Sequence, residues 1–422
     1  MGRRVSAARG RGHTWRAVAP AIEAIERRIL FAALDPTWAG DGIELEPYPT
    51  QSPQHSAVLA IAVLAGDKVL ALAEHFDLTA HDPSPTHTLV RYNADGSVDT
   101  TFGGGDGIVP VAGMARDMVV AADGTIYLSM SDPGAFGGRS LGVARYLEAR
   151  NSDGSLKTTF AGDGRYDFTY AGDPGSAREL CIALAPDGDL FAATASATRG
   201  GTEETPTFAE HTKVVKLNPD GTGDSAFDGD GVLTYTPDDG HPDVGDIVVQ
   251  PTGHLVMLST SDFQFTRIAP GSAVQEVYRP FPGIYPQQIA VQPDGKILAV
   301  ESTSFSLPPY YLSVGRLNAD LTLDTSYGTD GVARGPDTNN GTTKIISAFG
   351  VDNEGRAVAV ANYVDEHSLL MRFTPDGSFD TSVAPGVGLP LDIFGAHALA
   401  FTPDGKYVIG SRVRGVAGEQ RD

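Results

Sequence analysis

The chain has 422 residues, including 50 glycines, 28 prolines and one cysteine, and its formal net charge is −22 at pH 7. A protein this acidic is a poor partner for nucleic acids and anionic membranes, because both require a cationic surface. One cysteine excludes an internal disulfide and a cysteine metal cluster, and the apolar run LCIALAP around Cys181 predicts a buried, inert thiol.

The N-terminus differs in charge from the rest of the chain. Residues 1–28 hold seven arginines and two glutamates, so they carry +5 and the remainder carries −27. No standard signal peptide follows the arginines, and no segment is apolar over the length that a membrane span needs. We expect residues 1–26 to be a basic, mostly disordered export segment and residues 27–33 (RRILFAA) to form a strand.

Apolar hairpins recur along the rest of the chain. Each joins two short apolar runs across a D-G type turn, which is the strongest short-range signal for a β-hairpin. The hairpins cover residues 60–73, 118–130, 181–194, 246–259, 288–300, 350–361 and 398–410.

A second unit falls between the hairpins. It begins with a strand that ends in a cation and often an asparagine, as in LVRYN (89–93) and VVKLN (214–218). A turn, a D-T-T-F-like element and a GDG sequence follow and lead into another short strand. Copies of this ending occupy residues 34–45, 98–109, 156–166, 223–233 and 323–333.

Four short strands per unit, repeated seven times, predict a seven-bladed β-propeller of four-stranded antiparallel blades. The last hairpin has no strand after it, so we expect the strand at 27–33 to complete the final blade and close the ring, which removes free sheet edges. The strand after each GDG is expected to be the innermost of the next blade. The propeller would then occupy residues 27–415 as one domain, followed by a tail at 416–422.

The stretch from Arg91 to Val109 (RYNADGSVDTTFGGGDGIV), with its later copies, resembles the delta-60 repeat family of bacterial β-propellers. The resemblance spans roughly residues 34–410 and implies an extracytoplasmic propeller without family-wide catalytic residues. Residues 25–31 (IERRILF) are similar to the LE-x-R-x-LLS motif that opens many planctomycete secreted and surface proteins. This second resemblance implies export without an ordinary signal peptide, to the cell surface or beyond it.

Two sets of repeated side chains are expected to hold the blades together. An aromatic residue in each GDG copy would wedge between neighbouring blades and bury a large apolar area. A cation at the end of each preceding strand faces a recurrent aspartate, which predicts an ion pair between blades. The aromatics are Trp38, Phe102, Phe160, Phe227 and Tyr327, and the cations include Arg91, Lys216, Arg316 and Arg372.

The aspartates of the same corners offer a second interpretation, calcium binding. Calcium takes six to eight oxygen ligands. The spacing of glycine and glutamate that an EF-hand requires is absent here, and the position of Asp99 is occupied by Lys157 in the next copy. Hydrogen-bonded turns explain the pattern better. The candidate ligands are Asp224, Asp228 and Asp230, which are the best set, and Asn93, Asp95, Asp99 and Asp106. The sequence establishes no cofactor, and calcium is the candidate that these corners offer.

Other candidate sites lie in the connecting loops. His75, His81 and His87 suggest a metal site, although three solvated histidines are the simpler interpretation. The loops at one face vary in length, as binding surfaces do, and carry the aromatics Phe136, Phe208, Phe305, Tyr310 and Tyr311, which are suited to a peptide or a sugar.

The sequence therefore favours an exported, monomeric binding or scaffold module for a protein or polysaccharide ligand. A propeller lyase or hydrolase with its site at the channel mouth is one alternative, and it would need a convergent cluster of His, Asp, Glu or Arg at the channel rim. A calcium-stiffened structural repeat is the other alternative.

Overall fold

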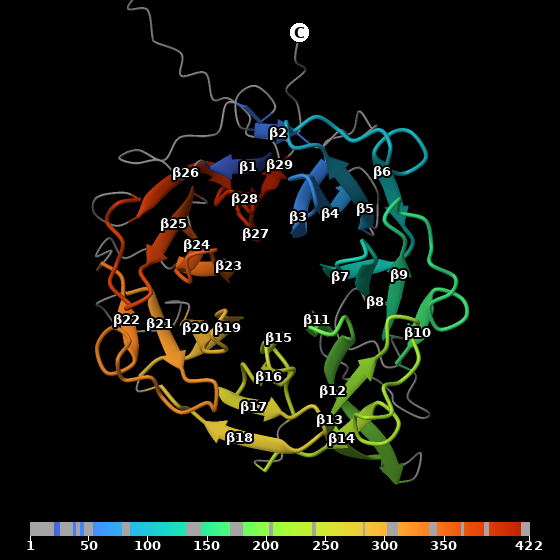
Figure 1. Ribbon diagram of the computed structural model, residues 1–422, viewed down its shortest axis with the longest axis vertical. Coiled ribbons are helices and arrows are strands. Elements are labelled where there is room, and N and C mark those ends of the chain that lie inside the picture. Colours follow the sequence, from blue (N-terminus) through green and yellow to red (C-terminus); the bar gives the residue numbers. More distant parts are fainter. Residues whose placement is uncertain are drawn as a thin grey trace, which may run out of the picture.

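The structure is a computed structural model, and Figure 1 shows its strands arranged as a ring of sheets around a central axis. It describes residues 21–25, 37–38, 43–45, 54–77, 85–131, 145–168, 180–201, 206–238, 242–281, 283–301, 311–336, 344–363, 367–383 and 388–414. All regular elements in these ranges are β-strands. The described residues include no helix of the length and apolarity that a membrane crossing requires.

Six of the sheets have four antiparallel strands each. Five of them follow the chain without a break, and the sixth combines the last hairpin with two strands from the N-terminal part of the chain. The consecutive sheets are β7 (Met114–Val120), β8 (Ile126–Ser131), β9 (Arg145–Arg150) and β10 (Arg165–Asp167); β11 (Cys181–Leu184), β12 (Leu190–Gly201), β13 (Pro206–Leu217) and β14 (Val232–Tyr235); β15 (Asp246–Val249), β16 (Leu255–Leu258), β17 (Gln264–Ile268) and β18 (Val274–Tyr278); β19 (Pro286–Val291), β20 (Ile297–Glu301), β21 (Ser313–Leu317) and β22 (Val332–Arg334); and β23 (Lys344–Val351), β24 (Ala357–Tyr363), β25 (His367–Phe373) and β26 (Leu389–Phe394).

The sheet that closes the ring has the order β2-β1-β28-β27, made of β1 (Ala21–Ile25), β2 (Ile43–Leu45), β27 (Ala398–Phe401) and β28 (Tyr407–Gly410). Closure by an N-terminal strand is therefore present, but the strand is β1, inside the predicted export segment. The predicted strand at 27–33 lies outside the described residues. β1 pairs with β28 in a register in which Ile22 lies opposite Gly410 and Ile25 opposite Tyr407.

The remaining sheet has five strands in the order β29-β3-β4-β5-β6. Its members are β3 (Gln54–Val63), β4 (Val69–Asp77), β5 (Thr86–Tyr92), β6 (Ile108–Val111) and β29 (Arg412–Arg414). The prediction of seven four-stranded blades is therefore wrong, because only six sheets have that composition. The cause is β29, which leaves the last hairpin at Gly410 and pairs with the inner edge of β3, so that Arg412 lies opposite Ala57.

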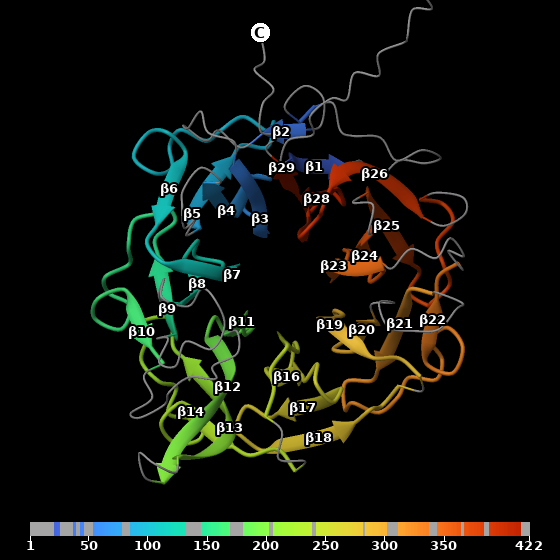
Figure 2. The same cartoon turned by 180° about the vertical axis from the view of Figure 1, so that it is seen from behind.

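The predicted strand order within a blade is also wrong. The strand after each GDG sequence was expected to be innermost, but β6 pairs with β5 at the outer edge of its own sheet. Figures 1 and 2 place β7, β11, β19 and β23 around the centre and β6, β10, β14, β18, β22 and β26 at the rim. The first strand of each hairpin is thus the inner strand, and the hairpin turns gather on one face of the ring.

The hydrophobic core is divided into clusters that lie between neighbouring sheets. One cluster joins Leu70, Leu72 and Phe102 of the five-stranded sheet to Met118 and Ile126 of the next sheet. Short apolar strands with both faces covered by neighbouring sheets produce this pattern. Cys181, predicted to be buried, is only half-buried on the inner strand β11.

Candidate functional site

The corners between the third and fourth strands of each sheet carry a repeated ion pair. Asp99 accepts from Arg91 Nε at 2.7 Å and from Lys68 Nζ at 2.6 Å, while its other oxygen accepts from the Thr101 backbone N–H. Burial opposes ionisation, but the Lys68 and Thr101 hydrogen bonds and Arg91 hold the pKa of Asp99 well below its usual range. The same pair recurs as Lys216–Asp224 (2.7 Å), Arg316–Asp324 (2.8 Å) and Arg372–Asp380 (2.7 Å).

These ion pairs lie within one sheet, so the predicted ion pair between blades is wrong. The chain turns back at the corner and the Asp99 backbone N–H donates to the Arg91 carbonyl, which places the carboxylate beside its own strand. The arginine instead reaches the next sheet with its remaining donors. Arg91 Nη1 donates to the Ser152 carbonyl at 2.6 Å, and Arg316 Nη1 donates to the Pro375 carbonyl at 2.5 Å.

The repeated aromatic residues lie fully buried beside these corners. Phe102, Phe160 and Phe227 have no exposed area, Tyr327 is 1% exposed and Trp38 is 4% exposed. Each packs in a cluster whose members come from two neighbouring sheets. Trp38 packs between the sheet that closes the ring and the five-stranded sheet, with Val69 on one side and Val408 on the other.

The candidate calcium ligands are already engaged within the protein. The Asp95 carboxylate accepts a hydrogen bond from the Ser97 backbone N–H at 3.0 Å. The Asp230 carboxylate accepts one from the Val232 backbone N–H at 2.9 Å. Each of the other candidates also has a hydrogen-bond partner: Ser97 for Asn93, Arg91 for Asp99, Ile108 for Asp106, Lys216 for Asp224 and Ser272 for Asp228. No group of three or more His, Cys, Asp or Glu side chains is placed to hold a metal ion in the part of the chain that the structure describes.

The predicted histidine cluster is divided by the pleat of the sheet. Glu74 lies opposite His87 and His75 opposite Thr86, so the two histidines point to opposite faces of β4 and β5. His75 is bonded to the hydroxyl groups of Ser56 and Thr88 at 2.9 Å each. His81 lies outside the described residues.

Most of the predicted ligand-binding aromatics fall outside the described part of the chain. This applies to Phe136, Phe305 and Tyr310, and to the side chain of Phe208, whose backbone belongs to β13. Tyr311 is described and half-buried.

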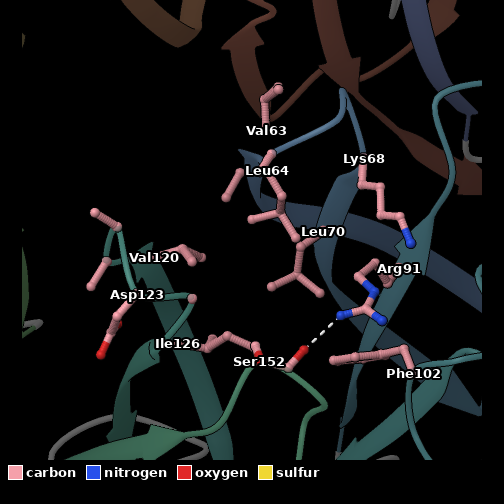
Figure 3. Close-up of a pocket in the computed structure, with 15 residues that line it drawn as sticks. Val63, Leu64, Lys68, Leu70, Arg91, Phe102, Val120, Asp123, Ile126 and Ser152 are labelled. Carbon is pink, nitrogen blue, oxygen red and sulfur yellow. Dashed lines mark hydrogen bonds between the residues drawn. The ribbon is translucent and has the colours of Figure 1, made fainter.

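A pocket of about 460 Å³ opens between the β3–β4 turn and the β7–β8 turn, on the face opposite those variable loops. Figure 3 shows Val63, Leu64 and Leu70 on one side of it and Val120 and Ile126 on the other. The lining is mainly apolar. The polar groups at its edge are Lys68, Arg91, Asp123 and Ser152.

Leu64 at this boundary differs from the residues at the same position of two other boundaries. Leu64 follows β3, at the position that Gln250 occupies after β15 and Gln292 after β19, and all three form the same turn hydrogen bond four residues on. The Gln250 amide donates across the boundary to the Gly295 carbonyl, and that of Gln292 donates to Gly355, each at 2.7 Å. Leu64 has no side-chain donor for this hydrogen bond, as is also true of Ala121 and Ala185 at the same turn position, and the corresponding Gly124 lines the pocket. Comparing the turns in sequence would have shown this difference.

Comparison with known proteins supports a bacterial β-propeller family in outline. Residues 79–102 and 292–327 match a family model described as a domain of unknown function (DUF5122) beta-propeller, which is less than half of the chain. No curated protein matches the chain. The delta-60 repeat and the planctomycete-type N-terminus stay predictions.

Several solved structures are distantly similar. They include virginiamycin B lyase from Staphylococcus aureus (13% identity, 85% of this chain and 94% of that chain, TM-score 0.49) and a streptogramin B lyase (14%, 87% and 97%, TM-score 0.47). A protein of unknown function from Dyadobacter fermentans is also similar (12%, 86% and 96%, TM-score 0.40). Similarity this low carries no argument about activity.

Proposed function

We propose that this protein is an exported binding module that holds an apolar side chain of a protein partner in the pocket between the β3–β4 and β7–β8 turns. The observation behind the proposal is the pocket itself, whose volume of about 460 Å³ and apolar lining are those of a small binding site. Its base is formed by Leu70, Phe102 and Ile126, which are at most 2% exposed. A guest side chain would therefore continue the core that these residues form.

The chemistry of the lining favours a protein partner over a carbohydrate. Sugars bind by stacking on an exposed aromatic face, but the Arg91 guanidinium lies over the Phe102 ring, 4.6 Å from its centroid. Arg91 itself is held by Asp99 and the Ser152 carbonyl. Lys68, which is paired with Asp99, and Asp123, which is paired with Lys157, lie at the edge of the pocket, where the polar flanks of a peptide segment would lie.

Peptide selection tests the proposal. A random peptide library is selected on the full chain and counter-selected on Leu64→Gln, whose amide should place a polar group across the apolar pocket and donate to the Gly124 carbonyl. We expect the enriched peptides to share one large apolar residue and to lose about tenfold or more in affinity for Leu64→Gln, since burying such a side chain contributes about 1.5–3 kcal/mol.

Leu64→Met is the matched control, because it keeps the apolar lining and should keep the affinity. Peptides that bind Leu64→Gln as tightly as the parent would contradict the proposed site. Export is tested separately by locating the tagged full chain in fractionated cells.

An enzymatic role is the second candidate, and one observation favours it. Glutamate, histidine and arginine side chains meet at the ends of β4, β5 and β7 that lie opposite the hairpin turns, and a catalytic site needs a convergent cluster of this kind. A structural repeat stiffened by calcium at the corners is the third candidate.

A further inference from the structure

A buried acid and a histidine face each other across β4 and β5 of the five-stranded sheet, at the strand ends opposite the hairpin turns. Glu74 on β4 and His87 on β5 are direct cross-strand partners, and His87 Nε2 lies 3.4 Å from Glu74 Oε2. His87 is 1% exposed and Glu74 is 7% exposed. The pair is thus almost wholly removed from bulk water.

This pair leaves buried polar atoms without hydrogen bonds. Both ring nitrogens of His87 and the Oε2 atom of Glu74 form none within the described part of the structure. Burial opposes the charge on Glu74, but His87, Arg116 and Arg412 lower the pKa of this carboxyl group. Leaving buried polar atoms unbonded is costly, so such atoms point to a functional site or to a group that binds there.

Two arginines approach Glu74 from neighbouring elements. Arg116 lies in a β-bulge of β7, where the register shifts between Ala115 and Asp117, and bulges redirect side chains near sites. Its Nη1 atom is 3.8 Å from Glu74 Oε2, and its side chain is one-third exposed. Arg412 is an exposed residue of β29 that also acts on Glu74 electrostatically. The fifth strand therefore brings the second cation.

These arginines differ from the cations of the corners. Arg91, Arg316 and Arg372 are each bonded to an aspartate at 2.7–2.8 Å. Neither the Arg116 nor the Arg412 guanidinium group makes a hydrogen bond to any residue that the structure describes. Among the described residues, only the charge of Glu74 acts on both guanidinium groups, which leaves their donors available to a ligand there.

A histidine lies next to Arg412. Arg412 Cβ and His397 Nε2 both come within 4 Å of the space that a side chain at Gly395 would occupy. Burial and the charge of Arg412 lower the pKa of His397, so its ring is neutral at pH 7 and can donate a hydrogen bond without adding charge.

An oxyanion fits this arrangement better than a cation. A guanidinium group matches carboxylate and phosphate oxygens in geometry and charge. The two arginine charges exceed the single glutamate charge, so this site is locally positive on a protein whose net charge is −22. The surrounding acidic surface would repel a polyanion, which favours a small ligand with one oxyanion group. We propose that Arg116 and Arg412, backed by the Glu74–His87 pair, bind a carboxylate or phosphate group of such a ligand.

Thermal unfolding of the full chain tests this site with two probes, sodium acetate and inorganic phosphate. Each is added up to about 100 mM at pH 7 against sodium chloride of equal ionic strength, because a ligand of the folded state raises the midpoint. We expect at least one probe to raise the thermal midpoint. A rise with acetate alone would identify a carboxylate as the bound group, and a rise with phosphate alone would identify a phosphate. Arg116→Gln and Arg412→Gln should weaken the apparent affinity by about tenfold or more, as expected for lost charge-assisted hydrogen bonds.

Arg165→Gln is the matched control, because it removes the same charge from a surface arginine paired with Asp167. Midpoints in chloride alone show whether each variant folds. The proposal is overturned if neither probe raises the midpoint of the parent, or if folded Arg116→Gln and Arg412→Gln respond like Arg165→Gln. The site does not depend on the apolar pocket, so Leu64→Gln should leave this response unchanged.

Discussion

Asp246 links two inner strands and makes stability depend on pH. Its carboxylate accepts from the Ile247 N–H on β15 and from the Ile289 N–H on β19, each at 2.8 Å. Burial outweighs these bonds and, with the charge of Asp117, raises the pKa of Asp246 to about 7. The folded protein therefore binds this proton more tightly than the unfolded chain, where an aspartate titrates near pH 4, so stability falls as pH rises toward about 7 and then levels off.

Asp246→Asn removes this titration. Relative to the parent, the variant should gain on the order of 2 kcal/mol in free energy of unfolding between pH 5.5 and 7, and only about 0.4 kcal/mol more by pH 8.5. Urea unfolding over this range measures the difference, away from the isoelectric point near 4.7. Two curves that run parallel across the range would show that Asp246 does not titrate there.

Single residues also mark where the sequence was sufficient and where it was not. The aromatics Phe102 and Phe227 were found because a large residue recurs at one position beside glycine. The partner of Arg91 was not identified correctly, because spacing alone does not show that the chain turns back and presents Asp99 to its own strand. The pocket was missed because it lies between two hairpin turns that are distant in the sequence.

At the scale of elements, the hairpins were predicted correctly, but the position of the strand after each GDG sequence within its sheet was not. Alternating apolar runs around a D-G turn define a hairpin locally, and β3–β4 and β19–β20 lie where this pattern placed them. Which strand faces the axis depends on contacts between distant segments, so the position of β6 at the rim could not be read from its sequence. The strand β29 has three residues and no counterpart in the other repeats, so no pattern predicted it.

The corner between the third and fourth strands allows a test of calcium binding. We expect the thermal midpoint to be the same with millimolar calcium and with chelator, because Asp99, Asp224 and Asp230 already accept hydrogen bonds within the protein. Magnesium at the same concentration controls for ionic strength. A rise of several degrees with calcium alone would instead establish the calcium-stiffened repeat, since a ligand of the folded state raises its stability.

At the scale of the whole molecule, the ring and its closure by the N-terminus follow from counting strands. The count gave too many four-stranded blades, because it treated the chain after the last hairpin as an ending. That segment continues as β29 into the five-stranded sheet, while β1 and β2 complete the last sheet. The two ends of the described chain are thereby held in neighbouring sheets.

Removing the closing strand tests this arrangement. Deletion of residues 1–26 removes β1, which leaves the backbone groups of Tyr407–Gly410 on β28 without their partners and β2 without its only neighbour. An exposed strand edge invites pairing between molecules. We expect this deletion to lower the thermal midpoint by many degrees, broaden the transition and cause self-association in size-exclusion chromatography. Deletion of residues 1–20 is the matched control, because it keeps β1 and should unfold like the full chain. If both deletions behave alike, β1 does not close the ring and the propeller is complete from residue 27 onward.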